Sequence, residues 1–171
     1  MSVINGRMVV FLTSLGVSLD SYSAGFSLCA PDELIIASCQ LEEAKSRMVS
    51  FCASADRAMV SYRFGLSSNV EINSVFFSDR TLSRWVDLAT YTVYLGFRRG
   101  EYSYVFGVPQ ERPGAKSFLD VFKDNKAIMS AKCTDNSFGE KDIRNSAIKE
   151  VADEFVRGYG FVFPPNDIAE H

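Results

Sequence analysis

Histidine is almost missing from this sequence, because the only one, His171, is the last residue. A Ser-His-Asp or Cys-His catalytic arrangement therefore has no histidine in the body of the chain to serve as its general base. The motifs GxSxG and HExxH and the phosphate-binding motifs GxxxxGKS/T and GxGxxG are absent as well. We therefore expect a protein that is not an enzyme, although the 21 Asp and Glu residues leave a glycosidase-type carboxylate pair open.

A basic excess is also absent, since the formal net charge is -3. Nucleic-acid binders usually carry a clear basic excess, so a nucleic-acid partner is not expected. Removal of residues 1–25 would delete one positive charge, Arg7, and one negative charge, Asp20, and would leave the net charge unchanged. A protein partner fits this balance, with weak electrostatic steering.

No apolar run is long enough to span a bilayer. The run Met8–Leu19 has about a dozen residues, which is the length of a signal-peptide core. Small residues that suit cleavage follow it, either Ser21 and Ser23 or Ser23 and Gly25. We expect a signal peptide over 1–25 and one periplasmic or secreted domain over 26–171, without stable membrane insertion after cleavage; a buried N-terminal strand or helix is the alternative.

The four cysteines include no CxxC motif, which excludes thioredoxin-like and zinc-ribbon signatures. An even number of cysteines in an exported chain predicts two disulfides, and we expect no metal ion or other cofactor. In a hairpin that turns near Lys45, Cys39 and Cys52 would lie opposite each other within disulfide reach. The first expectation is Cys39–Cys52 with Cys29–Cys133, and the alternative is Cys29–Cys52 with Cys39–Cys133.

Most of the chain after the first cysteine reads as short strands. Alternating β-branched and aromatic residues, separated by turn residues, predict half-buried strands. Eight such segments are expected, at 34–40, 47–53, 58–64, 69–77, 91–98, 101–108, 118–123 and 127–133.

One long helix is expected near the C-terminus. Ser137 and Glu140 have the spacing of a capping box, and Gly158 suits a helix stop. Apolar residues between them share one face at helical spacing, namely Ile143, Ala147, Ile148, Val151, Ala152 and Phe155. A short helix is expected over 79–87 and a last strand over 159–163. The predicted fold is therefore mainly β, with about eight strands in a single antiparallel sheet or flattened barrel, one long helix and two disulfide staples.

A resemblance to a known group of proteins lies between Cys39 and Glu71. There "SCQLEEAKSRMVSFC" is followed by "YRFG" and then "VEI". This order resembles periplasmic lysozyme inhibitors and the periplasmic immunity proteins that block peptidoglycan-degrading effectors of type VI secretion. The resemblance covers about a fifth of the chain. It implies a small, mainly β, disulfide-bonded protein that inserts a loop into the active site of a cell-wall hydrolase, either an amidase or a lysozyme.

The resemblance has a departure. C-type lysozyme inhibitors carry an S-G-x-x-Y loop, whereas the nearest text here, "RRGEYSY", has no serine before its glycine. The long helix expected near the C-terminus is also unlike the compact barrel of those inhibitors. An amidase-immunity protein or another divergent inhibitor is therefore preferred to a lysozyme inhibitor proper.

An inhibitor of this kind needs an exposed, rigid loop rich in small polar residues. Three segments qualify as partner-binding candidates: Gly65, Leu66, Ser67, Ser68 and Asn69; Asp135, Asn136 and Ser137; and Arg98 and Arg99. Either arginine could pair with a carboxylate of the partner. Each segment also fits a purely structural role, as a hairpin turn, a helix cap and a solvated turn respectively.

A secreted module that binds a glycan or another small ligand is the alternative function. Its aromatic residues would stack on sugar rings, with Tyr91, Tyr94, Tyr102, Tyr104 and Trp85 as the candidates. Aromatic residues at strand spacing also fit an ordinary core.

Overall fold

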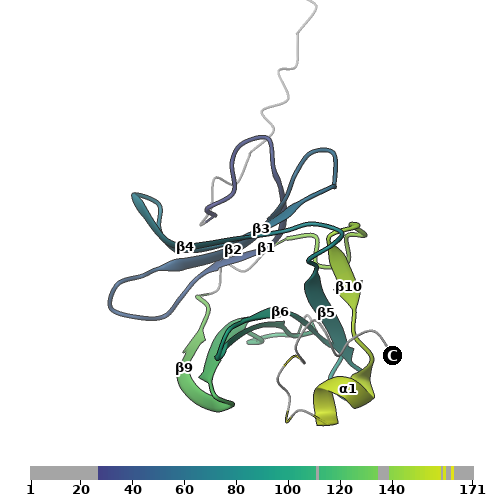
Figure 1. Ribbon diagram of the computed structural model, residues 1–171. Coiled ribbons are helices and arrows are strands. Elements are labelled where there is room, and N and C mark those ends of the chain that lie inside the picture. The colour runs from purple at the N-terminus through teal and green to yellow at the C-terminus, as the bar shows by residue number, and fades with distance from the viewer. Residues whose placement is uncertain (1–26, 111, 135–138, 159, 161–162, 164–171) are drawn as a thin grey trace, which may run out of the picture.

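The period-two runs form strands along most of the chain (Figure 1). The computed structural model describes residues 27–110, 112–134, 139–158, 160 and 163. All eight expected strands are present within one or two residues of their predicted ends. The predicted signal peptide lies outside the described residues, and most of the strand predicted over 159–163 does too.

The first four strands form one antiparallel sheet in the order β1-β2-β3-β4. They are β1 (Leu34–Gln40), β2 (Met48–Ala53), β3 (Val60–Leu66) and β4 (Asn69–Phe76). Hairpin turns join each strand to the next, so strands that follow one another in sequence are neighbours in space. In this order β4 stands at an edge of the sheet.

The other six strands form a second sheet in the order β10-β5-β6-β7-β8-β9. They are β5 (Leu82–Asp87), β6 (Thr92–Arg99), β7 (Tyr102–Val108), β8 (Phe118–Lys123), β9 (Lys126–Lys132) and β10 (Ile148–Glu150). Strands β5 to β9 are antiparallel, whereas β10 returns from the C-terminal region to run parallel to β5.

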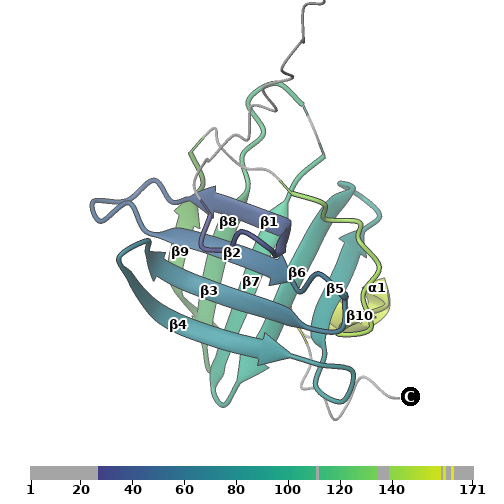
Figure 2. The same ribbon diagram turned by 90° about the horizontal axis from the view of Figure 1, so that it is seen from above.

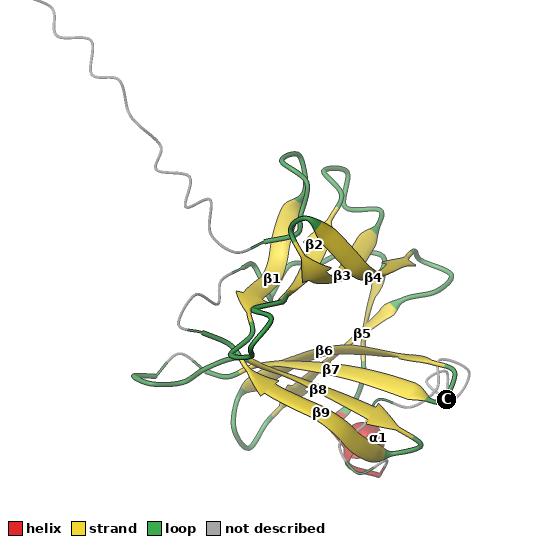
Figure 3. Ribbon diagram, turned by 90° about the vertical axis from the view of Figure 1, so that its left-hand side faces the viewer, coloured by secondary structure: helices red, strands yellow, loops and turns green. Residues whose placement is uncertain are grey.

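The two sheets face each other, and their strands cross rather than run side by side (Figures 2 and 3). Aromatic side chains from both inner faces meet between them. The ring centroids of Phe51 and Phe106 are 5.6 Å apart, and those of Tyr62 and Phe97 are 5.0 Å apart. All four rings are buried, and each contributes on the order of 1.5–3 kcal/mol to folding.

The expectation of a single sheet or flattened barrel is wrong, because the ten strands divide into two sheets that do not close into a barrel. The sheets are joined at one corner. Leu41, just after β1, forms an isolated antiparallel bridge with Cys133, just after β9. A disulfide between Cys39 and Cys133, with Cα atoms 5.7 Å apart, fastens the same corner.

The preferred disulfide pairing is therefore also wrong, and the alternative is observed: Cys29 bonds to Cys52, and Cys39 bonds to Cys133. The hairpin register explains why. Cys39 lies opposite Val49, and both point into the core. Because alternate strand residues point to opposite faces, Cys52, three positions after Val49, points away from that core.

The N-terminal arm, residues 27–33, lies on the outer face of the first sheet. The Leu28 amide donates to the Ser50 hydroxyl at 2.9 Å. Arg63 donates one hydrogen bond to the Leu28 carbonyl at 2.9 Å and another to a Glu33 carboxylate oxygen at 2.8 Å. With the disulfide from Cys29, these bonds hold the arm against strands β1 to β3.

The expected long helix is not formed. Asn145 accepts a hydrogen bond on its side-chain oxygen from the Ala147 amide, a local contact that competes with helical bonds. The chain then enters β10, and just after this strand the Val151 amide donates to the carbonyl of Arg84 in β5. Within the described residues, the short helix α1 (Asp153–Gly158) follows. Ile143 and Ala147 still reach the core, from turns rather than from a helix.

The short helix expected over 79–87 is a strand, β5. Its side chains alternate between the two faces of the sheet, as in a strand. Leu82 faces the core between the sheets, whereas Trp85 faces the outer side of the second sheet. There Trp85 stacks on Tyr94 with ring centroids 4.5 Å apart and donates its indole N–H to Asp153 of α1 at 2.9 Å. Among the described residues, no helix is both long enough and apolar enough to cross a bilayer.

Candidate functional site

An apolar cleft opens between the two sheets beside β4 and β9. It has a volume of about 170 Å³. We call it the apolar cleft and define it by nine lining residues: Tyr62, Phe64, Ile72, Tyr102, Tyr104, Leu119, Val121, Ile128 and Met129. The first three come from β3 and β4, and the other six from β7, β8 and β9, so both sheets build it.

The burial of β4 shows where the sheets part. Phe76, Ile72 and Val70 alternate along this strand on the face that looks toward the second sheet. Phe76 is 4% exposed, Ile72 is half-buried and Val70 is 41% exposed. On the opposite side Ile128 of β9 is 57% exposed. The core thus becomes accessible toward the start of β4, which is where the apolar cleft lies.

Tyr62, one of the lining residues, carries a buried polar group. The residue is fully buried, and its hydroxyl has no hydrogen-bond partner within the described part of the chain. Burial, with a smaller contribution from the nearby Tyr104, raises the pKa of Tyr62 far above the ordinary tyrosine value; the nearby Arg47 opposes the shift only weakly. The phenol is therefore neutral and keeps its proton for donation across the whole physiological range.

Two cations stand over aromatic residues of the cleft. The Arg47 guanidinium lies 4.6 Å from the ring centroid of Phe64, and the Lys123 ammonium lies 5.5 Å from that of Tyr102. Each is held by carboxylates: Arg47 by Glu43 at 2.8 Å and by Glu71 at 3.1 Å, and Lys123 by Glu101 at 3.5 Å.

These carboxylates also raise the pKa values of the two cations. Hydrogen bonding to Glu43 is the largest effect on Arg47 and raises its pKa, and the negative charge of Glu101 raises the pKa of Lys123. The rim of the cleft therefore carries charges of both signs. Its lining, in contrast, contains no charged residue.

Two of the three predicted partner-binding segments border this cleft. Ser67 and Ser68 form the turn between β3 and β4, and the other residues of this segment, Gly65, Leu66 and Asn69, are the strand ends beside it, directly after the lining residue Phe64. Gly65 has a φ of 142° at a β-bulge, and a Cβ there would lie 2.5 Å from the Asn69 carbonyl oxygen, so the turn needs glycine. Ser67, Ser68 and Asn69 are exposed.

The second segment, Arg98 and Arg99, ends β6 and leads into the turn before β7. Arg98 is half-buried and Arg99 is exposed. The lining residue Tyr102 follows this turn, and the turn is braced by a hydrogen bond of 3.0 Å from the Asp124 amide to the Glu101 carbonyl. The fold therefore places the two segments beside one cleft. The third segment, Asp135, Asn136 and Ser137, lies outside the described residues.

The sequence interpretation missed the cleft itself. Alternation along β3 predicted that Tyr62 and Phe64 share a face, and they do. The contribution of Tyr102, Val121 and Met129 could not be predicted, because it depends on how two separate sheets cross. The signal in the sequence was the cluster of aromatic residues in strands that end at tight turns.

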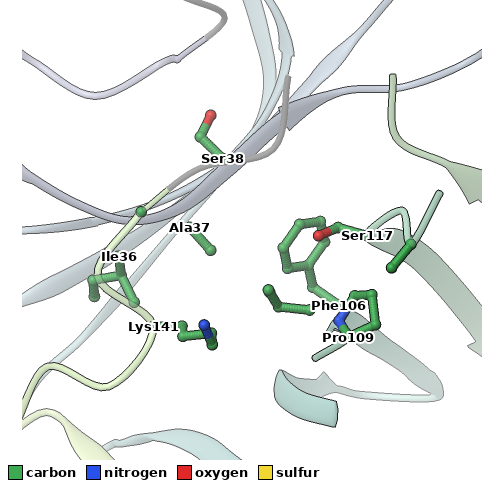
Figure 4. Close-up of a pocket in the computed structure, with 10 residues that line it drawn as sticks. Ile36, Ala37, Ser38, Phe106, Pro109, Ser117 and Lys141 are labelled. Carbon is green, nitrogen blue, oxygen red and sulfur yellow. The ribbon is translucent and has the colours of Figure 1, made fainter. Parts of the chain in front are cut away.

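A second cavity, of about 130 Å³, lies at another corner between the sheets (Figure 4). Its lining includes Ala37 from β1, Phe106 from β7 and Lys141. Figure 4 shows the Ala37 methyl directed toward the cavity and the Ser38 hydroxyl directed away from it. That hydroxyl lies 2.8 Å from the hydroxyl of Ser50 on the outer face. Gly139, next to the third candidate segment, also lines this cavity.

One group among the described residues brings metal-ligating atoms within 4.8 Å of one another: Cys29, Glu33 and Cys52. The two sulfurs are bonded to each other, and disulfide sulfurs are not thiolate ligands. The Glu33 carboxylate is held by Arg63. This group therefore stabilises the N-terminal arm and offers no thiolate site while the disulfide is intact.

The residues considered for stacking on sugars divide into two kinds. Trp85 is 1% exposed and stacks on Tyr94, so neither ring offers an open platform. Tyr91 is 60% exposed and stands alone in the turn before β6. Tyr102 and Tyr104 line the apolar cleft.

Comparison of the chain with known proteins found no matching family model, no matching curated protein and no matching solved structure. What can be said about function therefore comes from the chemistry of the cleft and of the two turns beside it.

Proposed function

We propose that this protein is an exported, non-catalytic inhibitor of a peptidoglycan-degrading hydrolase, of the kind that immunity proteins represent. The observation that carries the proposal is the position of the two candidate turns beside one apolar cleft. Exposed polar groups on Ser67, Ser68 and Asn69 stand next to an apolar surface on one side. Arg98 and Arg99 lead into the turn on the other side.

Export to an oxidising compartment, the periplasm or the exterior, is supported by the disulfides. All four cysteines are paired, and such bonds persist mainly outside the cytoplasm. The segment that resembles inhibitors, Cys39 to Glu71, supplies Arg47, Tyr62 and Phe64, so the resemblance and the cleft coincide in the first sheet.

Rigidity of the turns supports inhibition by surface complementarity. A bulge with a glycine fixes the turn after β3, and a backbone hydrogen bond braces the turn before β7. Ordering a loop on binding costs free energy, and a loop that is already ordered avoids that cost. The serine hydroxyls would meet polar groups of the hydrolase active site while Leu66 fills an apolar subsite.

The test is a titration of the disulfide-bonded protein against a panel of peptidoglycan amidases and lysozymes. We expect stoichiometric loss of activity for at least one enzyme. Ser67→Arg should weaken that inhibition by about tenfold or more, because a bulky cation replaces a small group at the centre of the contact.

Ala55→Arg is the matched control. Ala55 is an exposed residue in the turn between β2 and β3, at the opposite end of β3 from Ser67. The Ala55→Arg substitution introduces the same side chain away from the cleft and should leave inhibition unchanged. The proposal is wrong if no enzyme of the panel is inhibited, or if both arginine variants inhibit as well as the parent protein.

A further inference from the structure

The two disulfides differ in how far they lie from solvent. Cys39 and Cys133 are both 0% exposed and belong to the core between the sheets. Cys52 is also 0% exposed, but its partner Cys29 is only half-buried and belongs to the N-terminal arm. A thiol reductant must reach one sulfur of a disulfide to attack it. The arm disulfide is therefore the easier target, and Cys29 is the side from which it is attacked.

The arm needs little free energy to move away from the first sheet. None of residues 27–33, all of which the structure describes, is buried. Side-chain hydrogen bonds to Ser50 and Arg63 hold the arm in place. A segment with few buried apolar contacts opens locally at a much lower free energy than the whole fold. Local opening thus exposes Cys29, whereas access to the other disulfide requires the two sheets to part.

Arg63 lies beside the sulfur that leaves. Its Nη1 is 3.7 Å from the Cys52 Sγ, and its Nη2 donates to a Glu33 carboxylate oxygen at 2.8 Å. When Cys29 is attacked, the departing Cys52 sulfur carries a negative charge, and a neighbouring guanidinium stabilises that charge. A Glu33 oxygen lies within 4.8 Å of both sulfurs, but Arg63 already offsets its charge.

We propose that Cys29–Cys52 is a redox-active disulfide and that its reduction by a dithiol releases the N-terminal arm while Cys39–Cys133 stays closed. The arm then alternates between a docked state, held by the bond, and a free state that uncovers the outer face of β1 to β3. The inference does not depend on hydrolase inhibition, because both states are measured on the protein alone.

The reaction is a thiol–disulfide exchange in two steps. One thiolate of the dithiol attacks the Cys29 Sγ, the bond to Cys52 breaks, and its electron pair leaves on the Cys52 Sγ, which takes up a proton. The second thiolate of the reductant then attacks the mixed disulfide at the reductant's own sulfur. The reductant becomes a cyclic disulfide, and the Cys29 thiolate leaves and takes up the second proton. Two electrons and two protons have passed to the protein.

The rate of reduction of each disulfide is measured on the native, fully disulfide-bonded protein, with dithiothreitol as the dithiol. Samples are quenched with N-ethylmaleimide at intervals and mapped by mass spectrometry. We expect Cys29 and Cys52 to be alkylated about tenfold or more faster than Cys39 and Cys133, because local opening is far more frequent than separation of the sheets.

Release of the arm is measured by amide hydrogen exchange. After reduction of the arm disulfide, amides over 27–33 should exchange about tenfold or more faster than before, while β6 to β8 keep their protection and show that the fold is intact. The double variant Cys29→Ala with Cys52→Ala carries no added alkyl group and should give the same exchange pattern.

Arg63→Gln separates stabilisation of the leaving sulfur from tethering of the arm. It removes the guanidinium beside Cys52 and also hydrogen bonds to the arm. If Arg63 only tethered the arm, the variant would be reduced faster than the parent protein. We expect reduction to be slower by about threefold or more, because the charge on the leaving sulfur loses its partner. Arg144→Gln, at an exposed position before β10, is the matched control and should be reduced at the parent rate.

Three results would overturn the inference. The first is reduction of both disulfides at one rate, or of Cys39–Cys133 first. The second is an arm that is as well protected after reduction of its disulfide as before. The third is an Arg63→Gln variant that is reduced as fast as the parent protein or faster.

Discussion

Cys39 in the first sheet is bonded to Cys133 at the end of the second, across 94 positions of sequence. The bond joins two sheets that are also linked at this corner, among the described residues, by an isolated backbone bridge between Leu41 and Cys133. The other disulfide, Cys29–Cys52, spans 23 positions and fixes the N-terminal arm. The first bond therefore fastens the two sheets together, whereas the second fixes the N-terminal arm to the first sheet.

Removing the disulfides should separate these contributions. In the chain-entropy description, the long crosslink stabilises the folded state by about 4.7 kcal/mol and the short one by about 3.5 kcal/mol. Urea unfolding should show a larger loss for Cys39→Ala with Cys133→Ala than for Cys29→Ala with Cys52→Ala. Peptide mapping without reduction should recover the same two pairs, and recovery of a Cys39–Cys52 peptide would contradict the structure.

Glu33 should make stability depend on acid. Burial acts to raise the pKa of Glu33, but hydrogen bonds from Arg63 and from the Ala30 amide, with the charge of Arg63, outweigh it and hold the pKa below the ordinary value. A lowered folded-state pKa adds stability that is present above the unfolded value, about 4.3, and is lost as the pH falls through the folded one.

Glu33→Gln should therefore lower the free energy of unfolding at pH 7, by about 1–2 kcal/mol, and should have much less effect at pH 3. Urea unfolding at pH 7, 5, 4 and 3 measures this difference. Asp32→Asn, at the neighbouring exposed position, is the control and should change little at any pH. An equal loss for Glu33→Gln at pH 7 and pH 3 would show that the carboxylate charge is not involved.

Gly96 should tolerate no side chain. A Cβ there would lie 2.3 Å from the Phe163 ring and 2.5 Å from the Tyr104 carbonyl oxygen, which is backbone and cannot move aside. Gly96→Ala should destabilise the protein by about 1–3 kcal/mol or more. Gly158→Ala is the matched control, because nothing lies within 4 Å of the added carbon, and its melting temperature should stay close to that of the parent protein.

The unpartnered hydroxyl of Tyr62 predicts that its removal does not destabilise the protein. Tyr62→Phe removes a buried polar group that has no hydrogen bond in the described chain, so it should leave stability unchanged or raise it by up to about 1 kcal/mol. Ser38→Ala, in contrast, removes a buried hydroxyl that lies 2.8 Å from the Ser50 hydroxyl and should lower stability by about 1 kcal/mol. Chemical denaturation of the two variants side by side checks the contrast.

Local patterns predicted the strands well and the assembly poorly. The eight period-two runs formed strands because alternation is a local property that one buried face enforces. The long helix failed because Ile148 and Val151 suit a strand as well as a helix, and β10 could pair with β5, more than sixty residues away. The segment 79–87 was predicted wrongly for a related reason, since Trp85 pairs with Tyr94 of the next strand and bonds to Asp153, 68 residues away.

The candidate turns followed from the sequence because turn chemistry is local. Their common position beside one cleft did not, since it depends on the angle at which β3 and β4 cross the second sheet. The disulfide pairing turned on a hairpin register only three positions from the expected one. That shift is enough to send Cys39 and Cys52 to opposite faces.

The Cys39–Cys133 bond also acts as a pivot. It ties the two layers together at β1, whereas the apolar cleft takes Ile72 from β4, three strands farther across the sheet and roughly 14 Å away at ordinary strand spacing. Any rocking of one layer against the other changes their separation least at the bonded corner and most at the far one. The apolar cleft therefore lies in the part of the fold where this disulfide constrains the spacing of the two layers less.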